Sequence, residues 1–539
     1  MEAVNTVLGN PEYNRLQPSW IFVDDCYKGT REVKYGPGVK KYLPMFRREE
    51  AEARSHQGNS EHYNLRLEMA NYENFFRPTI DDIVGIMQAN RSTVKFGVDS
   101  DEESPEEVRD ILWYGNQYND GLAGLKHRLN HNQVLYGRYG MLLDIITDDD
   151  GLRPRFCISE YPAWKILDGQ TQKDRPDAPE RLRWCLLDET TRRHNPETKI
   201  WEVVTRWRVL ALDSSGYYYQ AVLEGTGSVE VFQVWAQFDI LAPPPELAVY
   251  PTFKGKRLDF IPLTVCNVNR LGFDQWQAPP YEDVAHIAIN NYRIDAVYKQ
   301  ALLNHATPTL VVCNAPSREN KEIYLGGALW LNSQGAAPIS VHLLETSGSG
   351  MGEMRTAKEN VREALKYSSI RDLLDGAGAN SSAEAMKLRT NSGTAAISAM
   401  DQTGARAIEE QLCFASEWAG ATREETADRI TFSADTSYLS TDLQLQSVAA
   451  MLQINQQTRT LSNEALYKLL ERAVPGVLPS YEDNEVQKLA DEENTLGILP
   501  TQVQEVTTLG GEKDEPEEPS GREKPETETP ETGEKKEGE

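Results

Sequence analysis

The stretch from residue 281 to residue 420 constrains the fold of this chain most, because it indicates three helices separated by short β segments and a glycine-rich loop. Two helices are predicted over Tyr281–Asn304 and Glu353–Leu374, where residues recur at three- and four-residue spacing and so share one helix face. The first seam is Val284, Ile287, Asn291, Ile294, Tyr298 and Ala301, and the second is Met354, Ala357, Val361, Ala364, Leu365 and Ser368. This order of elements is typical of a mechanical part rather than of a ligand pocket.

Three short apolar runs between these two helices are predicted to be strands, because they are partly β-branched and bounded by Pro and Gly. They are Thr309–Cys313, Ala328–Leu331 and Ile339–Leu344. After the second helix, Asp375–Asn380 is too rich in glycine to remain helical. Ser381 and Glu384 then have the spacing of a capping box, which satisfies two backbone N–H groups at a helix start. A long third helix is therefore expected up to Gly420.

The length and charge of the chain limit the classes of protein it can belong to. Its 539 residues are too many for one core, so we expect two to four subdomains. The net charge of −27, from 83 acidic and 56 basic residues, argues against a broadly basic nucleic-acid-binding surface. Residues 505–539 hold 13 acidic and 5 basic residues, a net charge of −8, so a disordered acidic tail is expected over 501–539.

The cysteines and the apolar runs indicate where the chain resides. Six scattered cysteines without a CxxC pair indicate unpaired, mostly buried thiols in a reducing compartment. The first residues lack a signal-peptide pattern, and no apolar run approaches the roughly 20 residues that a membrane helix needs. We therefore expect a protein made in the cytoplasm and not bound to a membrane.

Outside the stretch 281–420, the pattern changes from helical to β and back. Residues 1–50 are expected to be rich in loops, and residues 47–87 and 106–136 to be helical, with a break at Pro78. A buried strand at 140–146 and a β-dominated region at 153–250 are expected to follow. In that region residues 201–211 alternate with a period of two, and Ser228–Trp235 is interpreted as a further strand. The sequence then predicts a strand at 429–432 and helices near 442–457 and 463–473.

Three local patterns suggest a binding site, and each has a structural alternative. Gly348–Gly352 has the order of a phosphate-binding loop, but its spacing departs from GxGxxG and no P-loop lysine follows, which favours a flexible joint. Asp144 and the acids at 148–150 offer ligands for a divalent cation, although an acidic hairpin turn explains them more simply. His127 and His131 have metal-ligand spacing without a third ligand, which favours a helix surface or an intersubunit contact.

A basic column on the second helix leaves two interpretations open. Lys358, Arg362 and Lys366 recur every four residues, and like charges at this spacing cost a few tenths of a kcal/mol per pair. They either pair with acids such as Glu359, Glu363 or those of a neighbouring helix, or they face a passing phosphate backbone and attract it weakly and without sequence preference. Since neither a GxSxG motif nor a Ser-His-Asp or Cys-His group stands out, we do not expect an enzyme.

Several segments in a fixed order carry a family resemblance. They are Tyr42-Leu-Pro, Leu135-Tyr-Gly-Arg-Tyr-Gly-Met-Leu-Leu-Asp, Tyr161-Pro-Ala-Trp-Lys-Ile-Leu-Asp, Phe260-Ile-Pro-Leu, His305-Ala-Thr-Pro-Thr-Leu, Glu322-Ile-Tyr-Leu-Gly and Trp330-Leu. Together they resemble the portal proteins of tailed bacteriophages, specifically the portal-like prophage family formerly labelled as a domain of unknown function. The resemblance covers roughly residues 10–500, and its evidence is the order of the segments rather than any single motif.

The resemblance implies an α+β portal-protein fold, with wing, stem, clip and crown regions, that assembles as a ring. By position, 1–280 corresponds to the wing with its β-rich region at about 153–250, 281–304 to the first stem helix, 305–345 to the clip and 346–374 to the second stem helix. The tunnel loop then falls at 375–383, the long helix and the return to the wing at 384–440, and the helical crown at 441–500. The Trp- and Tyr-rich β region at 198–240 departs from a typical compact wing.

The resemblance also implies a function and its partners. A homo-oligomeric ring, expected to be a dodecamer, would occupy one vertex of the capsid in the virion, after assembly in the host cytoplasm. The implied partners are the large terminase subunit, the major capsid protein, a head–tail adaptor and double-stranded DNA, which passes through without sequence-specific binding during packaging and ejection. No cofactor, metal or membrane is implied.

The family's regions place candidate residues on this sequence. The candidates for the DNA channel and tunnel loop are Lys358, Arg362, Lys366, Asp375, Gly376, Gly378, Asn380 and Lys387. The candidates for docking of the terminase or the adaptor on the clip are Arg318, Glu319, Lys321, Glu322 and Tyr324. Two other classes stay open: a head-completion or minor capsid scaffold protein without a DNA channel, and a metal-dependent nuclease that uses the acids at 148–150.

Overall fold

The structure is a computed structural model that describes most of the first 434 residues. The described ranges are 10–89, 93–96, 106–116, 118, 120–147, 154–173, 180–196, 199–225, 227–306, 309–313, 328–331, 338, 340–344, 349–368, 383–423, 425–426 and 430–434. The chain divides into two compact units, Met1–Tyr438 and Leu439–Glu539, and all described residues belong to the first. The predicted helices near 442–457 and 463–473, the crown and the acidic tail lie outside the described residues. None of the described helices is long and apolar enough to span a membrane.

Six helices form the first part of the chain, where loops were expected over 1–50 and helices over 47–87. They are α1 (Pro11–Lys28), α2 (Thr30–Tyr35), α3 (Val39–Tyr42), α4 (Arg47–Ser55), α5 (Glu61–Met69) and α6 (Phe76–Ala89). The expectation of loops over 1–50 is therefore wrong for the described residues. The carbonyl oxygen of the Asn10 side chain accepts hydrogen bonds from the amides of Glu12 and Tyr13, which caps α1. Pro78 lies in the first turn of α6, where proline is tolerated, so it does not break this helix.

Two further helices lead into a three-stranded antiparallel sheet. The helices α7 (Glu106–Tyr114) and α8 (Gly121–Tyr136) confirm the helical pattern predicted over 106–136. Gly137, with a φ of 76°, ends α8 in the left-handed region that favours glycine. The chain then enters β2 (Arg138–Thr147), which lies between β3 (Pro154–Pro162) and β10 (Leu263–Asn267). A short 3-10 helix, η1 (Ala163–Lys165), follows β3.

A six-stranded antiparallel sheet confirms the predicted β-dominated region. It contains β4 (Ile166–Gln172), β5 (Arg181–Asp188), β6 (Thr191–His194), β7 (Trp201–Leu212), β8 (Tyr218–Gly225) and β9 (Ala248–Val249). The expected strand at Ser228–Trp235 is wrong, because this segment forms the helix α9 (Ser228–Ala236). Its inward residues Ser228, Val231, Phe232 and Trp235 have the spacing of one helix face, and α9 packs against β7 and β8.

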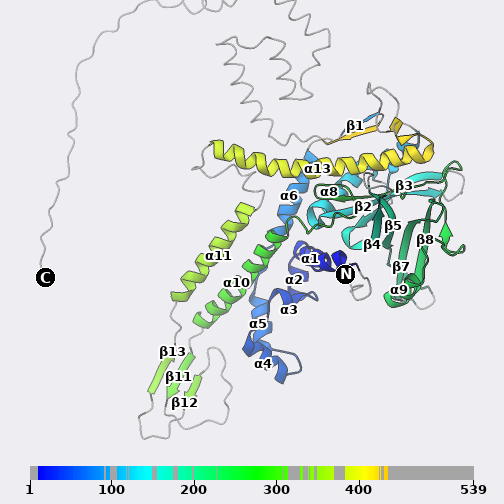
Figure 1. The fold of residues 1–539 in the computed structure, drawn as a ribbon. Helices are drawn as coiled ribbons and strands as arrows, with labels where there is room; N and C mark the ends of the chain where they lie inside the picture. Colours follow the sequence, from blue (N-terminus) through cyan, green and yellow to red (C-terminus); the bar gives the residue numbers. More distant parts are fainter. Residues whose placement is uncertain are drawn as a thin grey trace, which may run out of the picture. The chain divides into compact units, whose positions relative to one another are not determined.

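Residues 281–420 have the order of elements expected from the sequence (Figure 1). Helix α10 (Glu282–Ala306) leads to a sheet of β11 (Thr309–Cys313), β12 (Ala328–Leu331) and β13 (Ser340–Leu344), in the order β12–β11–β13. Helix α11 (Ser349–Ser368) returns from this sheet, and the 37-residue helix α13 (Ala383–Ala419) follows. The end of α13 leads to β14 (Ile430–Ser433), which pairs with β1 (Thr93–Phe96). The three predicted strands and the three predicted helices are thus confirmed.

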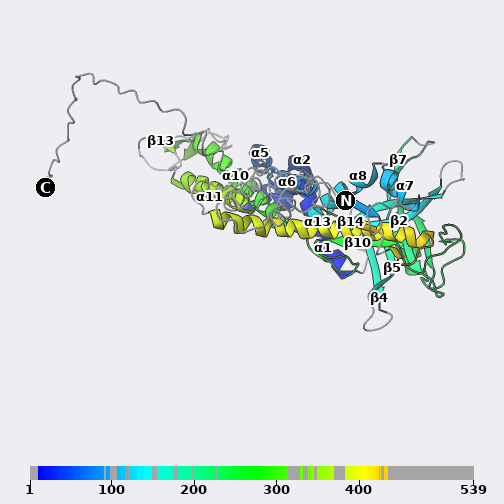
Figure 2. The ribbon, with the colours of Figure 1, turned by 90° about the horizontal axis from the view of Figure 1, so that it is seen from above.

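Helix α13 connects the two hydrophobic cores of the described unit. Ile397 and Met400 belong to the core formed by the first helices, α10 and one face of the six-stranded sheet. Ile408, Leu412 and Trp418 belong to the second core, with α7, α8 and the sheet of β2, β3 and β10. Figure 2 shows α13 passing across the elements of both cores. The α+β class predicted from the sequence is confirmed. All six cysteines are unpaired and four of them are buried, as expected.

Candidate functional site

A polar clasp joins α11 to α10, and its centre is Asp295 on α10. The Asp295 side chain is only 1% exposed and forms an ion pair with Lys358 of α11. It also pairs with Lys299, at 3.0 Å, and accepts a hydrogen bond of 2.8 Å from the backbone amide of Asn71. A buried carboxylate is costly unless donors surround it, and Asp295 has three. The clasp therefore connects three elements: α10, α11 and the segment between α5 and α6.

Glu73, from the segment between α5 and α6, forms the second half of the clasp. Its carboxylate accepts a 2.5 Å hydrogen bond from Arg362 and lies 3.6 Å from the Lys358 ammonium. The Asn291 side chain on α10 also donates to it, at 3.3 Å. Lys358 pairs with Asp295, whereas Arg362, one turn later on α11, pairs with Glu73 beside Asn291, one turn earlier on α10. The helices α10 and α11 therefore run antiparallel. Figure 1 shows these two helices side by side.

The environment shifts the pKa of both clasp acids downward. Burial alone would raise the pKa of Asp295, but the hydrogen bonds from Lys358, the Asn71 amide and Lys299 outweigh burial, so the pKa lies below its ordinary value of 3.8. Burial likewise opposes ionisation of Glu73. The hydrogen bond from Arg362 and the charge of Lys358 nevertheless hold its pKa below the ordinary 4.5. Both acids are therefore ionised at neutral pH and balance the charges of Lys358 and Arg362.

Over the residues 351–364, whose side chains are described, helix α11 contacts the rest of the unit through one narrow stripe. Met351, Met354, Lys358 and Val361 are half-buried, and the other side chains between 351 and 364 are exposed. Ala357 and Ala364, which the predicted seam placed inward, are exposed. A helix with this little apolar burial depends on its ion pairs and on further contacts for its position. Among residues 351–364, the clasp therefore supplies the charged contacts that attach α11 to α10.

The structure describes only part of the predicted channel and clip residues. Lys358 and Arg362 are paired with acids of neighbouring elements, as one of the two interpretations held, and their side chains are 17% and 45% exposed. Lys366 and Lys387 lie on the backbones of α11 and α13, and their side chains are outside the described set. Also outside the described residues are Asp375, Gly376, Gly378, Asn380, Arg318, Glu319, Lys321, Glu322 and Tyr324. Their assignment to a channel or a docking surface stays a prediction.

The expected joint at Gly348–Gly352 does not interrupt α11. Ser349–Gly352 are helical, and α11 begins at Ser349 rather than near Glu353. The flexible joint is therefore wrong for the described residues of this segment. A Cβ atom added at Gly350 or Gly352 would meet no atom within 4 Å, so neither glycine is needed for close packing. The first-turn amides of α11 have no acceptor within the helix, but the spacing of this segment departs from that of a phosphate-binding loop.

The other candidate binding groups are engaged with nearby side chains. Asp144 forms a 2.6 Å ion pair with Arg208, and the acids at 148–150 lie outside the described residues. His127 contacts the Gln88 side chain, and His131 packs edge-on against Tyr27 with 5.1 Å between ring centroids. Within the described ranges, no three His, Cys, Asp or Glu side chains are grouped so that they could hold a metal ion.

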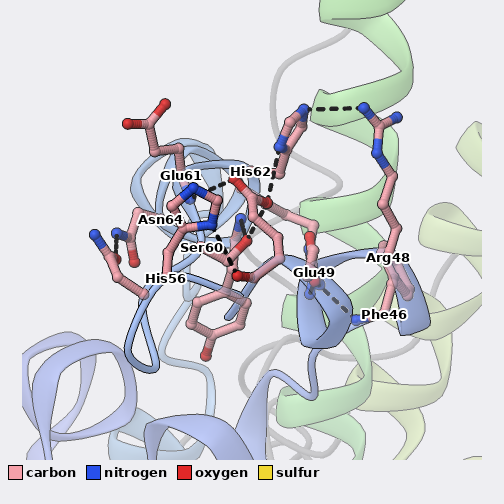
Figure 3. A network of polar contacts seen from close by, with 12 residues as sticks. Phe46, Arg48, Glu49, His56, Ser60, Glu61, His62 and Asn64 are labelled. Atoms are coloured by element: carbon pink, nitrogen blue, oxygen red, sulfur yellow. Dashed lines mark hydrogen bonds and ion pairs between the residues drawn. The ribbon is translucent and has the colours of Figure 1, made fainter. Parts of the chain in front are cut away.

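A second polar network, which includes Ser60, Glu61 and His62, connects α4 and α5 (Figure 3). Glu52 accepts hydrogen bonds from the Ser60 hydroxyl, at 2.7 Å, and from the Glu61 amide, and it contacts His62 Nδ1 at 3.0 Å. The hydrogen bond from Ser60 is the main reason why the pKa of Glu52 falls to about 2. Ser60 and His62 both bind Glu52 rather than each other, so this is not the nucleophile–base pair of a hydrolase. The network instead fixes the turn between two helices.

Asp295 and Glu73, the two acids of the clasp, were not predicted from the sequence. The predicted seam placed Ile294 inward on α10, but Asp295 is buried and Ile294 is only half-buried. A signal existed, because Asp295 lies four residues after Asn291 and three before Tyr298, which is the spacing of that same seam. Glu73 lies in a segment without periodicity and could not have been found in this way.

One family model matches the stretch that contains α10, α11 and α13. Residues 280–419 match a family model described as "Domain of unknown function (DUF4055)". This match is much narrower than the resemblance over 10–500, and its description names no activity. No curated protein matches the chain.

Two solved structures have chains that are similar to this one. A chain of "Virion of native gene transfer agent (GTA) particle" is 14% identical, with a TM-score of 0.36, and the match covers 78% of this chain and 95% of that chain. A chain of "Neck of empty GTA particle computed with C6 symmetry" is 13% identical, with a TM-score of 0.34, and the match covers 82% of this chain and 98% of that chain.

Proposed function

We propose that this chain is the subunit of a phage portal, a ring through which double-stranded DNA enters and leaves a capsid. The observation that carries the proposal is the antiparallel pair of α10 and α11, joined at one end by a three-stranded sheet and followed by a 37-residue helix. In the portal interpretation this order corresponds to two stem helices, a clip, and the long helix behind the tunnel loop. The sheet would dock the large terminase subunit during packaging and a head–tail adaptor afterwards, and the wing would contact the major capsid protein.

The charges around α11 suit a conduit that does not hold DNA tightly. Each phosphate that a protein neutralises adds affinity, so a row of free cations along a channel would slow the passage of DNA. Lys358 and Arg362 are balanced by Asp295 and Glu73, so these two cations do not form such a row. The net charge of −27 also disfavours tight binding of DNA. In this proposal the chain is not an enzyme and needs no cofactor, and a separate motor supplies the energy for packaging.

The test is the mass and shape of the purified protein. Native mass spectrometry and negative-stain microscopy should show a closed ring of about twelve copies, which head-to-tail contacts form when their repeated rotation closes. A stable monomer or a small oligomer without a central opening would contradict the portal and favour a head-completion or minor capsid scaffold protein. Cleavage of DNA in the presence of magnesium or manganese would contradict the non-enzymatic part of the proposal.

A further inference from the structure

We propose that successive copies of this chain meet through two oppositely charged faces, one on α11 and one on α3 and α10. The acidic face consists of Glu353, Thr356, Asn360 and Glu363 of α11. The basic face consists of Lys40, Lys41 and Arg293. The inference rests on the proposed function, because it requires copies to assemble head to tail. It goes beyond that function by naming the charged residues that bring neighbouring copies together.

The acidic face points away from α10 within one copy. Residues of an α-helix are about 100° apart around the axis, so Glu353 and Glu363, each five residues from Lys358, lie about 140° from it on either side. Lys358 faces α10 through its ion pair with Asp295. Both glutamates are exposed, and neither forms an ion pair with another described residue. Thr356 and Asn360 lie between them and are exposed as well.

The basic face lies on the side of α10 that is turned away from α11. Arg293 is two residues from Asp295 and so lies about 160° from it around the helix axis. Its guanidinium donates hydrogen bonds of 2.8 and 3.0 Å to the carbonyl oxygens of Tyr42 and Lys41, which attaches α3 to this side of α10. Lys40 and Lys41 are exposed, and neither they nor Arg293 form an ion pair among the described residues. Figure 1 shows α10 between α11 and α3.

A hollow in the basic face can receive a side chain from a neighbour. Its volume is about 170 Å³, its apolar wall includes Phe22 and Ile289, and Lys41 and Arg293 lie on its lining. The acid in this lining is Glu282, which lies 3.8 Å from His286. The hollow therefore offers two cations without carboxylate partners next to an apolar wall. A carboxylate that reached Lys41 and Arg293 from outside would form charge-assisted hydrogen bonds.

The two faces differ in charge and lie on opposite sides of the helix pair, so they suit a heterologous contact rather than a symmetric dimer. A heterologous contact closes into a ring when its repeated rotation completes a full turn without a rise along the axis. Each copy would present its acidic face to one neighbour and its basic face to the other. Complementary charges favour this order over the two like-charged pairings, since like charges brought together repel. The occupant of the basic face is therefore α11 of a second copy.

Reversal of charge on each face separately and on both together tests the inference. Mass photometry of the full chain should show that Lys40→Glu with Lys41→Glu lowers the assembled fraction about tenfold, as expected for like charges at an interface. Glu353→Lys with Glu363→Lys should do the same. The chain with all four substitutions should assemble again to near the wild-type level. Arg192→Glu with Arg193→Glu, on the exposed strand β6, makes the same charge change elsewhere and should leave assembly unchanged.

The possible outcomes separate the inference from the function on which it rests. If the wild type forms rings and the reversals on both faces leave them intact, the inference is wrong and the portal stands. If each reversal abolishes rings in chains that melt at the wild-type temperature, but the fourfold variant does not recover them, the two faces do not meet each other. If the wild type remains monomeric at every concentration, both the portal and this contact are wrong.

Discussion

At the scale of single residues, Asp295 shows how one buried charge can hold a helix that has little apolar surface. It lies on the inward face of α10 among Asn291, Tyr292 and Ala296, which are also buried. Its three donors come from three elements, so its charge is compensated only when α10, α11 and the segment around Asn71 are together. A buried carboxylate that loses its partners is strongly unfavourable. The position of α11 is therefore coupled to the ionisation of this residue.

We expect Asp295→Asn to destabilise the protein by about 2 kcal/mol, because Lys358 and Lys299 lose their shared counter-charge in a partly buried position. Urea unfolding followed by circular dichroism measures the change in the free energy of unfolding. Glu359→Gln is the matched control, since Glu359 forms an exposed ion pair with Arg355 on the same helix and should change stability by less than about 0.5 kcal/mol. Equal effects of the two substitutions would show that the clasp contributes nothing beyond a surface ion pair.

The clasp should also make stability depend on pH in the acidic range. The pKa values of Asp295 and Glu73 are lower in the folded protein than their ordinary values of 3.8 and 4.5. Their contribution is therefore complete above these ordinary values and is lost as the pH falls through the lower folded values. The free energy of unfolding, measured at pH 7, 5, 4 and 3.5, should fall more steeply below about pH 4.5 for the wild type than for Asp295→Asn with Glu73→Gln. Parallel curves for the two proteins would contradict this assignment.

Residue-level prediction from sequence succeeded for cysteines and failed for the clasp. All six thiols are unpaired, as their scattered positions indicated. The basic column was visible, because Lys358 and Arg362 recur at helical spacing, but its acidic partners were not. Glu73 is 289 positions away from Arg362 along the chain, and no local pattern links residues at such a separation. The choice between pairing and an exposed band depends on that contact, which only the fold provides.

At the scale of elements, regular patterns gave correct predictions and interrupted ones did not. The alternation over 201–211 predicted β7 correctly as a strand, since Thr205, Trp207 and Val209 are buried and the residues between them are not, although Trp201 and Val203 are exposed. Helix α1 was missed although Tyr13, Leu16, Trp20 and Val23 have helical spacing, since Pro18 lies inside it and suggests a break. The valines of α9 suggested a strand, but packing of Val231 and its neighbours on the sheet outweighs β propensity.

A substitution of Gly404 on α13 tests how closely this helix packs against α8. A Cβ atom at Gly404 would lie 2.6 Å from Leu129 Cδ2 and 3.2 Å from Asn130 Oδ1. Asn130 also donates a hydrogen bond to Asp401 of α13, so it has little freedom to move away. Gly404→Val should therefore destabilise the protein by about 1–3 kcal/mol through overpacking. Thermal and urea unfolding of the purified variant measure this loss.

The control substitution, Gly352→Ala, should change the free energy of unfolding in the opposite direction. Gly352 is helical in α11 and has open space around its Cα, so Gly352→Ala should stabilise the protein by about 0.5–1 kcal/mol through the higher helix propensity of alanine. A destabilising effect at Gly352 would mean that this glycine serves a joint or a close contact, as the sequence first suggested. No change at Gly404 would mean that α13 does not approach α8 closely.

At the scale of the whole molecule, the distribution of charge connects the helix pair with the proposed passage of DNA. The chain is strongly acidic, yet it places cations on α11 and then balances two of them with Glu73 and Asp295. The predicted channel set therefore divides into two classes. Lys358 and Arg362 serve the clasp, whereas Lys366 and Lys387 stay candidates for contact with the phosphate backbone.

Neutralising Lys358 with Arg362 should therefore affect stability and DNA affinity differently from neutralising Lys366 with Lys387 in the assembled protein. Lys358→Gln with Arg362→Gln should lower the free energy of unfolding by about 1–2 kcal/mol, because Asp295 and Glu73 each lose their charged partner on α11, with little change in DNA affinity. Lys366→Gln with Lys387→Gln should leave stability nearly unchanged but weaken non-specific DNA binding. Filter binding to linear duplex DNA at 50, 100 and 200 mM salt measures both the affinity and its salt dependence.

The salt dependence distinguishes a direct phosphate contact from an indirect effect of lost stability. Each phosphate contact removed should reduce the slope of log K against log salt by about 0.9. A reduced slope for the Lys358 and Arg362 variant, in rings of normal mass, would show that these cations reach DNA in spite of their ion pairs. In that case the clasp acids would weaken the attraction of Lys358 and Arg362 to DNA without abolishing it. A cation that is paired with a carboxylate still attracts a phosphate, although more weakly.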